Sequence, residues 1–211
     1  MSASAEPALR RGTAEETRRR IEDAAERLFR SMGYQKTAVA DIARELNMSP
    51  ANVYRFFPSK SAINEAIAAR MLDAMVADLR AIATGPGSAP DRLRRLLSAM
   101  FEAKIATMFD DRRLHDMVTA AMEESWGVVR SYIESVEAVT ARILADGMAS
   151  GAFLRADPAT LAKTVLHAMI AWNHPALLAW CIGRKGQTVG ELRVQVAEMT
   201  DFVLRGLRPD A

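Results

Sequence analysis

The side chains best suited to molecular recognition lie close together in residues 48–60, MSPANVYRFFPSK. An amide such as Asn52 can pair bidentately with adenine, and a guanidinium such as Arg55 can pair in the same way with guanine. Tyr54 and Lys60 carry donors that suit phosphate oxygens. These are the properties that a helix needs in order to enter the major groove of DNA.

Two prolines delimit this segment and predict that it is a short helix. Ser49 can cap the helix and Pro50 suits its first position, whereas Pro58 disfavours helical geometry in the residue before it. Val53 and Phe57 are four residues apart, so we expect both to bury against the preceding helix. The opposite face would carry Ala51 and Arg55.

Helices are also predicted on both sides of this segment. Thr13 with Glu16 forms a capping-box pattern for a helix over residues 14–32, and Gly33 suits its C-terminal end. Thr37 can cap a second, short helix that ends before a turn at Asn47 and Met48. Ser59 can cap a helix that continues to about residue 83.

Two short helices joined by a tight turn, with a longer helix before them, form a helix-turn-helix. Periodicity alone leaves a second interpretation open. The same pattern fits an ordinary corner of an all-α domain, in which Arg55 and Lys60 are only solvated.

The segment KTAVADIARELNMSPANVYRFFPSKSAINEAI resembles the DNA-binding domain of the TetR (tetracycline repressor) family of bacterial regulators. The likeness covers roughly residues 14–65 and rests on the D-I-A core, the S-x-x-x-x-Y-x-x-F run and the following S-K. It implies an all-α fold, with an N-terminal three-helix helix-turn-helix domain and a C-terminal helical domain for ligand binding and dimerisation. It also implies a homodimer that a small molecule releases from an operator in double-stranded DNA.

The resemblance and the residue chemistry together give the positions expected to contact DNA. They are Thr37, Ala40, Ser49, Pro50, Ala51, Asn52, Tyr54, Arg55, Phe56 and Lys60. Two departures from the family pattern concern contacts with DNA, the first a phosphate contact and the second base recognition. Phe56 stands where many relatives carry histidine, and Ala51 with Asn52 replaces a Gly-Thr or Gly-Ser pair.

Glycine and proline in TGPGSAPD, residues 84–91, predict a domain boundary. We therefore expect a flexible arm over residues 1–12, the DNA-binding domain over 13–58, a connecting helix over 59–83 and the second domain over 84–211. Small residues on predicted helices 157–174 and 188–205 favour a four-helix dimer interface. These helices could instead close the core of a single subunit.

Methionine and aromatic residues beyond residue 84 could line an adaptable apolar pocket, although such residues also fill ordinary cores. The candidates for ligand binding are Phe101, Met122, Trp126, His167, Met169 and Trp172. Few charges are available there to neutralise a ligand. A small hydrophobic or amphipathic effector is therefore expected.

The sequence offers little for catalysis or metal binding. No nucleophile with a base, convergent carboxylate pair or phosphate loop is recognisable, so we expect no enzyme and no cofactor. His167, His174 and Cys181 are spaced seven apart, about 10 Å along a helix, which is too far to share one metal ion.

Charge and hydropathy favour a DNA-binding protein of the cytoplasm. Residues 1–84 hold 13 Lys and Arg against 11 Asp and Glu, which accounts for the whole net charge of +2. Residues 165–183 are apolar but include two histidines, an asparagine and a proline, so no membrane span is expected. The function predicted is a sequence-specific transcriptional regulator, most simply a repressor on a palindromic operator. The alternative is a helical homodimeric interaction protein that keeps the fold without specific DNA binding.

Overall fold

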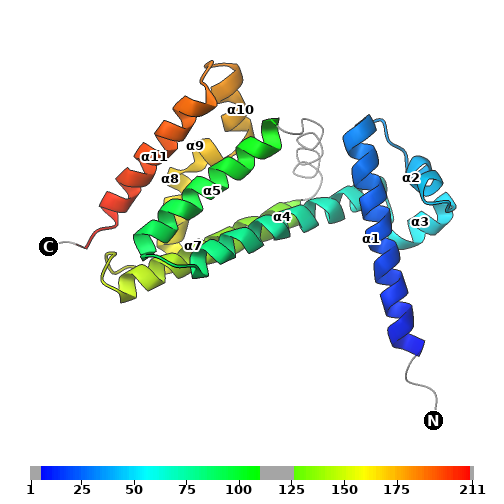
Figure 1. The fold of residues 1–211 in the computed structure, drawn as a ribbon, viewed down its shortest axis with the longest axis horizontal. Coiled ribbons are helices and arrows are strands. Elements are labelled where there is room, and N and C mark those ends of the chain that lie inside the picture. The colour runs from blue at the N-terminus through cyan, green and yellow to red at the C-terminus, as the bar shows by residue number, and fades with distance from the viewer. Residues whose placement is uncertain (1–5, 110–125, 210–211) are drawn as a thin grey trace, which may run out of the picture. The chain divides into compact units, whose positions relative to one another are not determined.

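The computed structural model describes residues 6–109 and 126–209, and the side chains of residues 14–107 and 127–209. Every regular element in these residues is an α-helix, which confirms the all-α prediction (Figure 1). The helices form two compact units. Residues up to Met71 and residues 126–129 make the first, and residues 72–109 with 130–209 make the second.

The first unit contains α1 (Glu6–Met32), α2 (Val39–Glu45), α3 (Pro50–Phe56) and the beginning of α4 (Lys60–Thr84). Its core brings Val53 and Phe57 together with Ile42, and Leu46 packs at its edge. The predicted buried face of α3 is therefore confirmed. The other buried members are Ile21, Ala24, Ala25, Phe29, Tyr34, Val39, Ala43, Ile63 and Ile67.

Several predicted helix ends are confirmed. Gly33 follows α1 with φ +96°, a left-handed conformation that glycine adopts without strain. The Ser49 hydroxyl accepts a hydrogen bond of 3.2 Å from the Asn52 N–H, and Ser59 accepts one of 3.0 Å from the Ala62 N–H. Phe57 has the extended backbone expected before Pro58.

Two predicted helix starts are wrong. The first helix begins at Glu6, so Thr13 lies inside it and residues 6–12 are helical rather than an arm. Pro7 is tolerated there because the first turn needs no N–H donor at that position. Ala38, not Thr37, precedes α2, and the Asp41 carboxylate accepts the Ala38 N–H at 2.9 Å.

The second unit contains the rest of α4 with α5 (Ala89–Phe109), α7 (Trp126–Ala149), α8 (Pro158–Ala168), α9 (Ile170–Asn173), α10 (Pro175–Gly183) and α11 (Val189–Gly206). The helices expected to begin near residues 157 and 188 do so, with Asp157 as the cap of α8 and Thr188 with Glu191 as the capping box of α11. The helix expected over 157–174 is interrupted at Met169, which separates α8 from α9. The helix expected over 112–125 lies outside the described residues.

Residues 84–91 form a turn within the second unit rather than a boundary between units. Val76, Leu79 and Ala83 of α4 share one hydrophobic cluster with α5. Arg92 reinforces the turn by donating hydrogen bonds to the Ala83 carbonyl at 2.5 Å and to Asp146 at 2.9 Å. Glycine and proline thus marked the turn correctly, but they carry no information about which helices share a core.

Candidate nucleic-acid interface

Helix α3 is held at its back and at its C-terminal end. Val53 is fully buried and Phe57 is 2% exposed. Arg18 of α1 donates a hydrogen bond of 2.7 Å to the Phe56 carbonyl, and its guanidinium carbon lies 4.2 Å from the centre of the Phe57 ring. A helix of seven residues has little stability alone, so these contacts fix its orientation.

The role of Arg18 was missed in the sequence analysis. The residue belongs to a run of arginines that composition describes only as a basic cluster. Its spacing of three and seven residues from the buried Ile21 and Ala25 was the available signal, because residues so spaced lie on one helix face.

The outer face of α3 presents hydrogen-bonding side chains. Ala51 and Arg55 are exposed, and Tyr54 is 51% exposed. The Arg55 guanidinium donates a hydrogen bond of 3.2 Å to the side-chain oxygen of Asn52. Ala40, Ser49 and Pro50 are exposed as well, whereas Phe56 packs partly against the core.

Lys60 and Thr37, two of the positions expected to contact DNA, make hydrogen bonds within the first unit. The Lys60 ammonium donates hydrogen bonds to the carbonyls of Tyr34 at 2.9 Å, Gln35 at 3.5 Å and Thr37 at 3.1 Å. Thr37 is 2% exposed, and its hydroxyl donates to the Gly33 carbonyl at 2.9 Å. Both residues thus hold the loop between α1 and α2.

An open hollow of about 460 Å³ lies between this loop, α3 and the start of α4. Its lining consists of Gln35, Lys36, Thr37, Ala38, Val39, Tyr54, Pro58, Ser59 and Lys60. Lys36 is exposed and adds a cation to the hollow. Lys36 was not among the residues predicted to contact DNA, although its place in a loop beside the predicted recognition helix is visible in the sequence.

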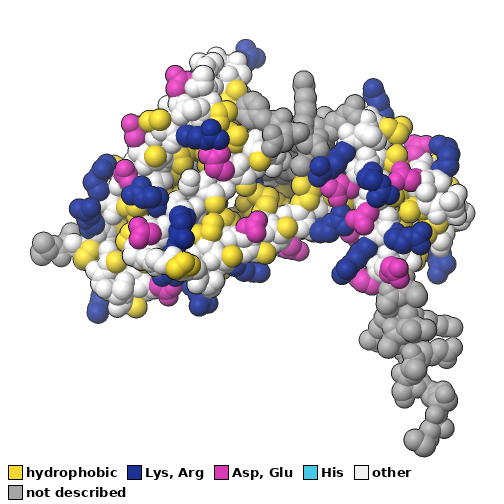
Figure 2. Space-filling view, in the orientation of Figure 1, with side chains coloured by type: hydrophobic (Ala, Val, Ile, Leu, Met, Phe, Trp, Pro, Cys, Tyr) yellow, Lys and Arg dark blue, Asp and Glu magenta, His cyan; other side chains and the backbone are white. Residues whose placement is uncertain are grey.

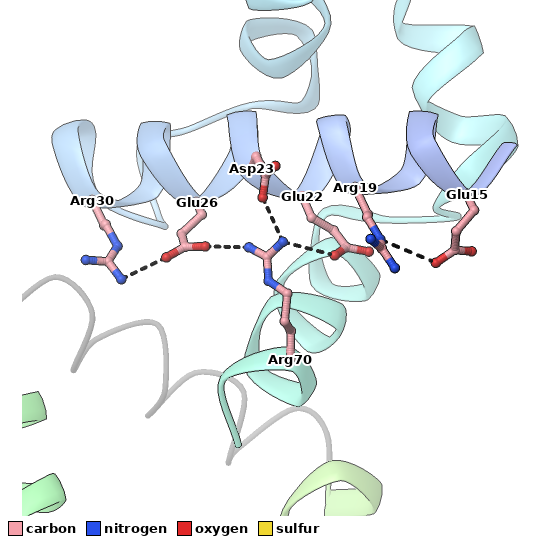
Figure 3. A network of polar contacts seen from close by, with 7 residues as sticks. All are labelled: Glu15, Arg19, Glu22, Asp23, Glu26, Arg30 and Arg70. Atoms are coloured by element: carbon pink, nitrogen blue, oxygen red, sulfur yellow. Dashed lines mark hydrogen bonds and ion pairs between the residues drawn. The ribbon is translucent and has the colours of Figure 1, made fainter. Parts of the chain in front are cut away.

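A cluster of ion pairs joins α1 to α4 on another side of the first unit (Figure 3). Arg70 lies 2.7 Å from Asp23, 2.6 Å from Glu26 and 3.6 Å from Glu22. Burial raises the pKa of Glu22, against the opposing charges of Arg70 and Arg18. Burial acts to lower the pKa of Arg70, but hydrogen bonds to Asp23 and Glu26 outweigh it, so the pKa is raised.

Basic and acidic side chains are interspersed over the visible surface of both units (Figure 2). The capacity to bind a polyanion is therefore local. At the outer face of α3 and the neighbouring hollow, the cationic side chains are Arg55, Lys36 and the partly buried Lys60.

Two family models together span most of the chain. One, described as bacterial regulatory proteins of the tetR family, matches residues 21–67, and the other, described as a tetracyclin repressor-like C-terminal domain, matches residues 89–188. The chain belongs to the TetR family. Proteins of the TetR family are regulators rather than enzymes; they bind operator DNA and form dimers.

Solved TetR-family structures share this fold over nearly the whole chain. A TetR/AcrR-family regulator from Thermobifida fusca is 25% identical, with a TM-score of 0.61, and the match covers 92% of this chain and 99% of that one. A regulator from Pectobacterium atrosepticum is 19% identical, with a TM-score of 0.70 and coverage of 94% and 97%. A comparison with curated proteins found no match.

A third relative was solved with a bound ligand. FadR from Thermus thermophilus, a repressor in complex with lauroyl-CoA, is 21% identical, with a TM-score of 0.59 and coverage of 89% of this chain and 91% of that one. The likeness at this identity shows the fold alone.

The predicted effector residues of this TetR-family chain fall in different environments. Phe101 and Met169 are buried in one hydrophobic cluster of the second unit. Trp172 packs at its edge, where its indole N–H donates to Gln195 at 3.4 Å. His167 is exposed on α8 and is not a member of that cluster. Met122 and the side chain of Trp126 lie outside the described residues.

Two further findings concern metals and membranes. Among residues that the structure describes, no group of three His, Cys, Asp or Glu side chains is placed to hold a metal ion. No helix in the same part of the chain has the length and hydrophobicity needed to cross a membrane.

Proposed function

We propose that this TetR-family chain is a homodimeric transcriptional repressor that reads a palindromic operator through α3. The observation that carries the proposal is the division of α3 into two faces. Its apolar face is anchored by Val53 and Phe57, while Asn52, Tyr54 and Arg55 form the opposite, accessible side. Amide and guanidinium groups on one short helix are suited to reading base edges in the major groove.

The contacts to DNA divide into two kinds. Asn52 and Arg55 contact bases, and the other contact positions on α2 and α3 lie close to the groove. These positions are Ala40, Ser49, Pro50, Ala51, Tyr54 and the partly buried Phe56. A backbone phosphate occupies the hollow beside α3, where Lys36 and the Tyr54 hydroxyl can reach it. Lys60 and Thr37 act indirectly, by holding the loop that carries Lys36.

Dimerisation uses exposed apolar side chains of the second unit. Trp180 of α10 is 49% exposed, and Val194 and Phe202 of α11 are 57% and 65% exposed. Val194 and Phe202 are eight residues apart and lie on one face of α11. A twofold dimer built on α8 to α11, near residues 157–174 and 188–205, would place two copies of α3 about 34 Å apart, one turn of DNA.

A small hydrophobic or amphipathic effector binds the second unit and releases the DNA. The buried Phe101 and Met169, with Trp172 at their edge, supply apolar surface for it. The lauroyl-CoA complex of the T. thermophilus FadR supports an effector with an acyl chain.

Fluorescence anisotropy tests the proposal. The full chain is titrated against a labelled duplex from the region upstream of its own gene, at two salt concentrations, with a shuffled duplex as control. We expect the upstream duplex to bind at least about 10³-fold more tightly than the shuffled one, with affinity that falls as salt rises. Equal affinity for both duplexes would contradict specific recognition and favour the interaction protein without an operator.

A further inference from the structure

Two polar side chains meet inside the second unit without forming a hydrogen bond. Lys104 lies on α5 and Tyr132 on α7, and the lysine nitrogen is 4.9 Å from the centre of the tyrosine ring. This cation–π contact joins the two helices, but it satisfies none of the three N–H donors of the ammonium.

Both polar groups lack partners among the residues that the structure describes. The Tyr132 hydroxyl is buried without a hydrogen bond. No described carboxylate pairs with Lys104, although the chain pairs many of its other cations, for example Arg193 with Glu102 at 2.7 Å. An unpaired buried donor costs free energy, so the Tyr132 hydroxyl, with the half-buried Lys104 ammonium beside its ring, calls for a functional explanation.

The surroundings change the acid–base properties of both groups. Burial lowers the pKa of the Lys104 ammonium to about 8 and raises the pKa of the Tyr132 hydroxyl. At neutral pH the lysine therefore still carries its charge and the tyrosine keeps its proton. Both groups are therefore hydrogen-bond donors at neutral pH.

Apolar side chains lie next to this pair on both helices. Phe101 and Ile105 are three residues before and one after Lys104 on α5, and Val136 is one turn after Tyr132 on α7. All three are buried members of the same hydrophobic cluster. A ligand that met the two donors would thus have apolar surface beside its polar end.

We propose that Lys104 and Tyr132 bind the carboxylate of an amphipathic acid, whose apolar part packs against the neighbouring cluster. The inference rests on the proposed function, because it assigns the polar end of the effector site. One carboxylate has two oxygens and can accept from the ammonium and from the hydroxyl together. A neutral alcohol would leave the buried charge unpaired, and an amine would add a second positive charge beside it.

Isothermal titration calorimetry on the full chain tests this site directly, without DNA. The probes are decanoate, 1-decanol and decylamine, which share one alkyl chain and differ only in the charge of the polar end. We expect the native chain to bind decanoate most tightly and decylamine most weakly. Lys104→Met should weaken decanoate binding about tenfold or more while leaving 1-decanol unchanged, and Tyr132→Phe should weaken decanoate binding about fivefold.

Lys163→Met is the matched control, because it removes an exposed lysine of α8 in the same unit. Its decanoate affinity should equal that of the native chain. The proposal is overturned if the native chain binds decanoate no better than decylamine, or if Lys104→Met binds decanoate as tightly as the native chain does. Circular dichroism on each variant shows that it is folded.

The two proposals fail separately. If the native chain does not bind its operator specifically, the repressor proposal is refuted, but the calorimetric result on decanoate still stands. Both proposals would be supported by a comparison on operator DNA. Decanoate at a concentration that dissociates the native chain from the operator should leave Lys104→Met bound.

Discussion

The ammonium of Lys60 donates a hydrogen bond of 2.9 Å to the backbone carbonyl of Tyr34. Its nitrogen also lies 4.5 Å from the centre of the Tyr34 ring. With the carbonyls of Gln35 and Thr37 as further acceptors, the three donors of the ammonium are all used. A lysine at the start of α4 thereby fixes the loop that leads into α2.

This geometry predicts that Lys60→Met weakens operator binding through the loop rather than through a lost phosphate contact. The free energy of unfolding should fall by about 1–3 kcal/mol, because three carbonyls lose a charged donor. Affinity for the operator should fall, while the slope of log affinity against log salt stays unchanged. Urea denaturation and anisotropy at several salt concentrations measure the two effects.

Lys36→Met is the matched comparison and is expected to behave in the opposite way. Lys36 is exposed at the rim of the hollow, so its removal should leave stability within about 0.5 kcal/mol of the native value. The salt slope should decrease by about 0.9, the contribution of one phosphate contact. An unchanged salt slope for Lys36→Met would contradict the proposal that a backbone phosphate binds in the hollow.

Arg55→Ala and Asn52→Ala are expected to change sequence preference, each by about 1–3 kcal/mol at particular base pairs. Asn52 accepts a hydrogen bond from Arg55, so losing the amide also frees the guanidinium. Non-additive effects in the double variant would reveal this coupling. Binding to a set of single-base operator variants measures the preference. Arg142→Ala removes an exposed arginine of α7 and should leave the preference unchanged.

The sequence was sufficient to predict α3 and its orientation because the signals there are local. Two prolines and a serine delimit the helix, and the spacing of Val53 and Phe57 identifies its buried side. The roles of Arg18, Lys60 and Thr37 depend on backbone carbonyls that the fold brings near them, at sequence separations of 38, 26 and 4 residues. No pattern of side chains marks a carbonyl as an acceptor, so these hydrogen bonds could not be predicted from the sequence.

The second unit was harder to interpret because its signals are distributed among several helices. The caps of α8 and α11 were predictable from Asp157 and Thr188, which act within one turn. The pairing of Lys104 with Tyr132 joins helices that are separated by residues 110–125, and neither residue has a distinctive spacing. Periodicity gives the buried face of each helix but not its neighbour.

Arg70→Met should destabilise the first unit by about 1 kcal/mol, because three carboxylates of α1 lose their shared partner. The loss should be largest at neutral pH and shrink as acid protonates Glu22, one of these carboxylates. Glu22 has a raised pKa, so it takes up its proton at a higher pH than usual, and this part of the loss should fade first. Urea denaturation between pH 3 and pH 7 would measure the trend.

Arg80→Met provides the control, since it removes an exposed arginine from the same helix. Its effect on stability should be small and independent of pH. A pH-independent loss for Arg70→Met would show that the side chain contributes through packing rather than through its ion pairs.

Phe202→Glu should convert the dimer to a monomer of 23.2 kDa in sedimentation velocity experiments. Phe202 is 65% exposed on α11, and a charge there would be buried without a partner in the proposed interface. Ile133→Glu, at a 48% exposed position on α7, is the control and should remain dimeric. Dissociation by Ile133→Glu but not by Phe202→Glu would place the interface elsewhere.

Lys104→Met should make the folded chain more stable while it weakens the binding of decanoate. The ammonium has a pKa of about 8 in the folded chain and about 10.4 when unfolded, so folding at neutral pH carries a penalty on the order of 3 kcal/mol.

Between these two pH values the unfolded chain binds more protons, and the stability of the native chain therefore rises with pH. The free energy of unfolding of the native chain should be lower than that of Lys104→Met. This deficit should be fully present below pH 8 and shrink as the pH approaches 10.4. The comparison is best made in a Tyr132→Phe background, because the raised pKa of Tyr132 would act in the opposite direction at higher pH.

Urea denaturation at pH 7.5, 9 and 10 measures this deficit. A deficit that does not change with pH would mean that the lysine is charged and solvated in the folded chain, as an ordinary surface lysine is. A deficit that closes with rising pH would show that the chain maintains a destabilising charge in its interior. Such a charge is stabilised when an anion binds, so the same lysine that lowers stability can couple ligand binding to the conformation of the second unit.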